Sequence, residues 1–142
     1  MSKLSDKIVK INTVLTDINN QKNRDVKLIA VTKNVKIQAI YEAIKQGIDN
    51  FGENRVQECE EKYLKIIKTF PKISLHMIGH LQTNKVKTAL NLFNVIHTVD
   101  RERLAKEINK HSSQNSATKY FFAQVNIGEE KQKSGIEISM TS

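Results

Sequence analysis

Apolar residues recur along this chain in two alternating patterns. The first is a stripe with steps of three and four residues, beginning with Leu4, Ile8, Ile11, Leu15 and Ile18, and it predicts an amphipathic packing helix. The second is a short run of apolar residues, which predicts a strand covered on both faces. The runs predict strands at 28–33, 48–51, 73–78, 93–99 and 120–127, and the stripes between them predict helices near 37–44, 56–66, 86–90 and 104–108.

The spacing of the predicted strands indicates the fold class. Each strand begins about 20 to 27 residues after the previous one, which is the length that a strand and its crossover helix require. No low-complexity linker or shift in composition interrupts the series. We therefore expect an α/β chain with a parallel sheet, preceded by an N-terminal amphipathic helix and forming a single domain over residues 1–142.

Composition narrows the class of protein without naming an activity. A chain of 142 residues that is 39% hydrophobic and 27% charged fits one soluble domain. No apolar run approaches the roughly 20 residues of a membrane span, and the N-terminus lacks the apolar core of a signal peptide. We expect a cytoplasmic protein that has no membrane partner. The single cysteine, Cys59, cannot form an internal disulfide and is predicted to lie in a helix core.

The formal charge of +8 raises the question of nucleic-acid binding. Only four of the 23 basic residues are arginines, the side chain whose planar fork best matches phosphates and guanine. The lysines are spread along the chain rather than clustered. We interpret the excess as a solvated surface and expect no nucleic-acid partner.

Lys33 is the leading candidate for chemistry because it ends the first predicted strand. The last residue of a buried parallel strand projects at the carboxyl edge of the sheet, where α/β proteins build their sites. Burial would lower the pKa of the amine from its usual value of about 10.4 and allow it to form a Schiff base with a carbonyl. The alternative is a strand-end lysine that reaches into solvent.

Three junctions between strands and helices are unusually polar, and all are expected at that same edge. Asn54 is either part of a pocket wall or a helix cap, and Thr83 or Asn84 is a candidate cap. His80 fits a surface histidine better than a catalyst, and His76, which alternates with apolar residues, fits a core histidine. The junctions are 32–34, 52–58 and 76–85.

Other chemistries find little support in the sequence. The four histidines have no zinc-ligand spacing with one another or with Cys59, so we expect no metal site. The chain lacks the glycine-rich phosphate loop, the dinucleotide fingerprint and the nucleophile elbow of serine hydrolases. A helix start separates Glu53 from Glu58, so nothing in the sequence places both carboxylates on one substrate.

Five motifs in order resemble the pyridoxal phosphate homeostasis protein family, also described as the proline synthetase co-transcribed family. The resemblance implies the barrel fold of the N-terminal domain of alanine racemase, with pyridoxal 5′-phosphate bound to Lys33 as an internal aldimine and Asn54 in the pocket wall. It also implies a non-catalytic carrier or regulator in cofactor homeostasis. The motifs are residues 28–33, 51–58, 76–85, 98–100 and 124–128, the last followed by Lys133-Ser134-Gly135.

The predicted strands make up only part of such a barrel. A closed barrel of this type has eight strands and about 250 residues, and the sequence supplies about five βα units. We expect a C-terminally truncated homologue that lacks the family's later phosphate-binding segments and self-associates through open sheet edges. Two alternatives remain: a degenerate fragment that has lost cofactor binding, and a racemase-like enzyme, which would need a second acid or base.

Overall fold

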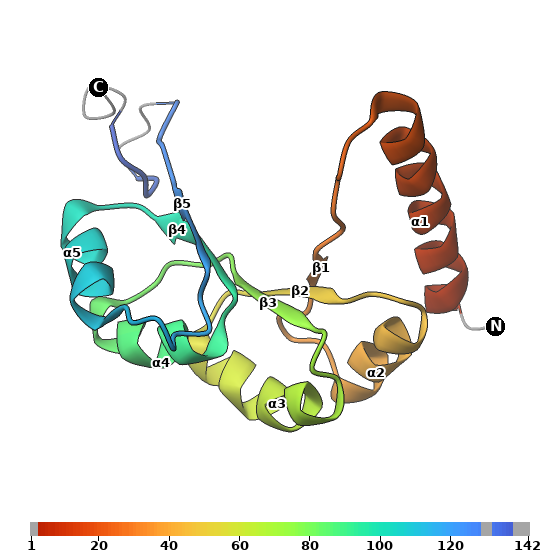
Figure 1. The fold of residues 1–142 in the computed structure, drawn as a ribbon, viewed down its shortest axis with the longest axis horizontal. Coiled ribbons are helices and arrows are strands. Elements are labelled where there is room, and N and C mark those ends of the chain that lie inside the picture. Colours follow the sequence, from red (N-terminus) through yellow and green to blue (C-terminus); the bar gives the residue numbers. More distant parts are fainter. Residues whose placement is uncertain (1–2, 129–131, 138–142) are drawn as a thin grey trace.

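The computed structural model describes residues 3–128 and 132–137, and in them a five-stranded parallel sheet. The strands pair in sequence order, as Figure 1 shows, so the sheet has no point at which the strand order reverses. Doubly wound sheets have such a point, whereas successive strands of a barrel are always neighbours. The strands are β1 (Ala30–Val31), β2 (Asn50–Glu53), β3 (Ser74–Met77), β4 (Val95–Val99) and β5 (Tyr120–Ala123).

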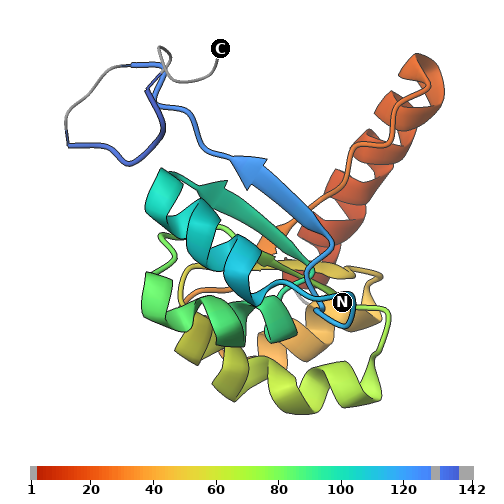
Figure 2. The same ribbon diagram turned by 60° about the vertical axis from the view of Figure 1, so that its left-hand side comes forward.

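Four helices cover one face of this sheet, and among the described residues no helix covers the other (Figures 1 and 2). The predicted alternation of strand and helix is therefore confirmed. Within the described ranges, no helix is both long enough and apolar enough to cross a membrane. The covering helices are α2 (Ile37–Lys45), α3 (Val56–Thr69), α4 (Val86–Leu92) and α5 (Glu102–His111); a 3₁₀ turn, η1 (Thr83–Lys85), precedes α4, and α1 (Lys3–Lys22) precedes the sheet.

The core lies between the sheet and the covering helices. Phe51 of β2 and Tyr63 of α3 are fully buried and pack with their ring centroids 5.8 Å apart. Cys59, one turn before Tyr63, is also fully buried, which confirms its predicted place in a helix core. Burial raises the pKa of the Cys59 thiol, so this residue is an unreactive packing group.

The predicted N-terminal amphipathic helix is present as α1, but only part of its apolar stripe is packed. Ile8 is buried, but Leu4, Ile11 and Ile18 are exposed. Figure 1 gives the reason, because α1 stands beyond the β1 end of the sheet instead of lying on it. The opposite end of the sheet is also open, since all four residues of β5 are exposed.

Four strands are shorter than the sequence predicts, β3 by one residue at each end and β4 by its first two residues, and one strand continues further. β1 stops at Val31, because Lys33 and Asn34 form a turn in which Asn34 has a φ of 58°. β5 stops at Ala123 instead of residue 127. β2 runs on to Glu53, through a glycine that the sequence suggests as a turn residue. Apolar runs thus locate the strands but do not set their ends, which depend on hydrogen bonds to neighbouring strands.

Candidate functional site

The register of β1 and β2 brings the two predicted site residues to the same level of the sheet. Val31 of β1 is paired with Gly52 of β2. Lys33 comes two positions after Val31, and Asn54 comes two positions after Gly52. Both therefore lie at the carboxyl edge on neighbouring strands. Lys33 is exposed, so the apolar surround expected for its amine is absent from the described residues. The sheet face that no helix covers leaves the end of β1 open; Val31 is itself 49% exposed.

The turn that carries Lys33 is bonded to α3 on both sides. The Lys62 ammonium donates to the Thr32 carbonyl oxygen at 2.7 Å, just before Lys33. The Asn34 amide, just after Lys33, donates to Glu58 Oε1 at 2.8 Å. Lys62 and Glu58 are joined in turn by an ion pair of 2.7 Å. The peptide groups that flank Lys33 are thus held by one pair of helical side chains.

A buried carboxylate completes this network. Glu53 has no exposed surface, and its Oε1 accepts from the Thr32 hydroxyl at 2.7 Å and from Lys62 at 3.0 Å. The Tyr63 hydroxyl lies 2.7 Å from the Thr32 oxygen and can donate a hydrogen bond to it, because the Thr32 hydroxyl donates its own proton to Glu53. The second oxygen, Oε2, has no hydrogen-bond partner among the described residues. Glu53 and Glu58, which nothing in the sequence places together, both bind Lys62 in the structure.

Lys62 and Glu58 each stabilise the charged form of the other. Burial alone would lower the pKa of Lys62, but hydrogen bonds and charges from Glu58 and Glu53 outweigh it and raise that pKa above its usual value. The hydrogen bond from Lys62, followed by that from the Asn34 amide, lowers the pKa of Glu58. Burial raises the pKa of the Tyr63 hydroxyl. At neutral pH Lys62 and Glu58 are therefore an ion pair and Tyr63 is neutral.

Sequence reasoning missed Lys62 as a member of the site. One local signal was available, because Lys62 follows Glu58 by four residues, and side chains at that spacing meet on a helix surface. The contacts with Thr32 and Glu53 join residues 30 and nine positions apart. No sequence pattern marks contacts of that kind.

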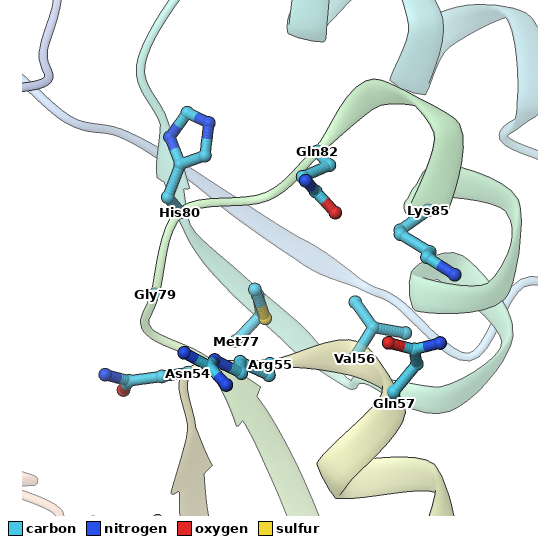
Figure 3. A pocket seen from close by; sticks show the side chains of 9 residues that line it. All are labelled: Asn54, Arg55, Val56, Gln57, Met77, Gly79, His80, Gln82 and Lys85. Carbon is cyan, nitrogen blue, oxygen red and sulfur yellow. The ribbon is translucent and has the colours of Figure 1, made fainter.

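Asn54 lines an open pocket of about 540 Å³ between the loops that follow β2 and β3 (Figure 3). Its side chain points away from Gln57 and Lys85, and Lys33 is not among the lining residues. Asn54 does not cap α3, because the N-cap position is Arg55. The lining carries two cations and three amides and no carboxylate, which favours an anionic ligand. The lining residues are Asn54, Arg55, Val56, Gln57, Met77, Gly79, His80, Gln82 and Lys85.

His80 stands at the boundary between this pocket and a second one of about 440 Å³. Its side chain is 54% exposed, in agreement with the prediction of a surface histidine. Nδ1 of His80 lies 3.1 Å from the buried carboxylate of Asp100, which also bonds Arg101. The second pocket includes Gln124 and Asn126 of the last predicted motif. Residues of three predicted motifs, 76–85, 98–100 and 124–128, thus line the second pocket.

His76 is a core histidine, as predicted. Its imidazole is hydrogen-bonded to Asn50 and to His97, each at 2.9 Å. Burial, with a smaller contribution from His97, lowers the pKa of His76 to about 4. The ring is therefore neutral at neutral pH and is already engaged on both nitrogens. Within the described part of the chain, no cluster of three or more histidine, cysteine or acidic residues is arranged to hold a metal ion.

No family model matches the chain, but curated proteins do. It is 41% identical over 118 residues to the pyridoxal phosphate homeostasis protein of Buchnera aphidicola, covering 83% of this chain and 51% of that protein. It is 38% identical over 128 residues to the protein of the same name from Haemophilus influenzae, covering 90% and 54%. The chain is similar to members of the pyridoxal phosphate homeostasis protein family. The family resemblance inferred from the five motifs is thereby confirmed.

Solved structures support the assignment of the fold. PipY of Synechococcus elongatus without PLP superposes with a TM-score of 0.70 at 37% identity, covering 78% of this chain and 51% of PipY. PipY with PLP bound gives a TM-score of 0.64 at 32% identity, covering 77% and 48%. The predicted fold class, a parallel β/α barrel segment with about five units, is confirmed. The chain spans about half the length of the curated relatives it matches.

Proposed function

We propose that this chain binds pyridoxal 5′-phosphate at the carboxyl edge of its sheet and acts in the cytoplasm as a non-catalytic carrier or regulator of that cofactor. Lys33 is the amine that forms the Schiff base, and Asn54 forms part of the pocket wall. The observation that carries the proposal is the hydrogen-bonded turn at the end of β1, which presents Lys33 at the level of Asn54.

The chemistry of the described residues fits the cofactor. Pyridoxal phosphate carries an aldehyde, which an amine can capture, and a phosphate dianion. The pocket beside Asn54 offers two cations, Arg55 and Lys85, and the first residues of α3, whose free amides favour anions. Val31, next to the turn, offers apolar surface to an aromatic ring. These groups support binding of a phosphorylated aldehyde.

The carrier role is favoured over a racemase by the state of the side chains near Lys33. Racemisation needs a second acid or base that can reach the substrate. Lys62 and Glu58, the titratable groups bonded to the Lys33 turn, are engaged with each other and with the backbone. Exchange of the α-proton of an amino acid would distinguish the enzyme, and the proposal expects none above the background of free cofactor.

Borohydride reduction tests the proposal directly. Protein incubated with pyridoxal phosphate and then reduced is expected to carry the label on the peptide containing Lys33, and Lys33→Ala is expected to lose that label. Lys36→Ala is the matched control, because Lys36 is an exposed lysine three residues away. Equal labelling of Lys33 and other surface lysines in the wild type would contradict the proposal, as would binding of no cofactor at all.

The open ends of the sheet lead to a further expectation, that the isolated chain self-associates. Tyr120, Phe121 and Phe122 are 66%, 42% and 54% exposed on a strand whose outer edge has no partner strand among the described residues. Exposed apolar edge strands are liable to pair with other chains. Analytical ultracentrifugation is expected to show oligomers or aggregates. A compact monomer that unfolds cooperatively would contradict this expectation.

A further inference from the structure

We infer that Lys62 and Glu58 are positioning residues for Lys33. Together they fix the turn that presents the Lys33 amine to an aldehyde. The hydrogen bonds of Lys62 keep its own amine from reacting with that aldehyde. The inference rests on the proposed function and deepens it, since it assigns a role to two side chains that bond the turn around Lys33.

The first argument is the placement of the bonds. Lys62 bonds the Thr32 carbonyl, immediately before Lys33, and Glu58 accepts from the Asn34 amide, immediately after it. The ammonium of Lys33 itself has no hydrogen-bond or ion-pair partner among the described residues. The network therefore holds the backbone on both sides of this residue and leaves its amine free.

The second argument is selectivity between two lysines that lie close together. All three N–H bonds of Lys62 have acceptors: the Thr32 carbonyl, Glu53 and Glu58. Its side chain is only 16% exposed. Schiff-base formation needs an unprotonated amine, whose nitrogen adds to the aldehyde carbon before a molecule of water leaves. Lys62 would have to give up two ion pairs to react, whereas Lys33 gives up none.

The third argument is the backbone conformation of the turn. Asn34 has a φ of 58°, in the left-handed region that asparagine adopts more readily than most residues with a side chain. Its amide is held by Glu58 on α3, so the hydrogen bond supports the conformation that reverses the chain after Lys33. Without that bond the turn can relax, and the Lys33 amine would sample more positions.

Glu58 allows this role to be separated from simple stabilisation of the fold. The side chain of Glu58 is 25% exposed, whereas Glu53 is fully buried. Replacing Glu58 removes the bond to Asn34 but leaves Lys62 bound to Glu53 and to Thr32. The variant is therefore expected to fold, and its defect should be local to the turn.

The experiment measures how fast each lysine of the intact chain is labelled by pyridoxal phosphate and borohydride, with the modified peptides quantified by mass spectrometry. Glu58→Ala is expected to slow labelling of Lys33 about tenfold, the effect of losing one charge-assisted hydrogen bond. Labelling of Lys36 is expected to stay unchanged. Glu58→Gln keeps an acceptor for the Asn34 amide and is expected to retain most of the rate.

Glu102→Ala provides the matched control. Glu102 pairs with Lys106 at the same i,i+4 spacing on α5, on the helix surface. This variant is expected to leave Lys33 labelling unchanged. If Glu58→Ala labels Lys33 at the wild-type rate, or slows Lys33 and Lys36 equally, the positioning role is wrong. If the wild type itself shows no preference for Lys33, the proposed function fails, and with it the inference.

Discussion

Replacing Lys62 by methionine is expected to lower the free energy of unfolding by about 3–5 kcal/mol, the cost of leaving one partner of a buried ion pair uncompensated. Glu53 is fully buried and, among the described residues, would keep only the Thr32 hydroxyl as a donor. Its Oε2 already has no hydrogen-bond partner in the described part of the chain. Methionine has nearly the volume of lysine, so lost packing contributes little. The shift in the urea unfolding midpoint measures the effect.

Lys106→Met is the control for this change. Lys106 forms an ion pair with Glu102 at 2.6 Å, but both side chains are more than three-quarters exposed. Exposed pairs contribute little because water and salt screen them, so no measurable shift is expected. If the two variants unfold at the same urea concentration, the charge of Lys62 is not needed to keep Glu53 buried.

The architecture could be predicted because the signals for it are local. Alternating apolar runs and helical stripes report which segments lie in the sheet and which cover it, and neither depends on distant residues. Local patterns fail where the burial of a residue depends on distant parts of the chain. The stripe that includes Ile11 and Ile18 reads as a packed helix surface, yet both residues are exposed because α1 stands beyond the end of the sheet.

The candidate site was predictable in part for the same reason. Lys33 and Asn54 follow apolar runs, and parallel strands bring their carboxyl ends to one edge, so their proximity follows from topology. Lys62 was missed because its importance depends on reaching β1 and β2 from the middle of α3. The apolar surround expected for Lys33 was also wrong for the described residues, since no helix covers that face of the sheet.

Gly79→Ala is expected to destabilise the chain by about 1–3 kcal/mol, the usual cost of overpacking, and to displace Asn54. A Cβ built on Gly79 would lie 2.6 Å from Asn54 Cα and closer still to the Asn54 carbonyl oxygen. These are backbone atoms, so no rotation of a side chain can relieve the contact. The loops after β2 and β3 would have to separate, widening the pocket that they line.

Gly52→Ala is the control for Gly79→Ala, because it adds the same methyl group without a clash against backbone atoms. Its Cβ would lie 2.9 Å from Ile78 Cδ1 and 3.1 Å from Ile29 Cγ2, both atoms of side chains that can move. Alanine also restricts the unfolded chain more than glycine does, which offsets part of the cost. We therefore expect the urea midpoint of Gly52→Ala to lie well above that of Gly79→Ala. Equal midpoints would mean that the two loops can separate freely, and that Asn54 is not held in place by Gly79.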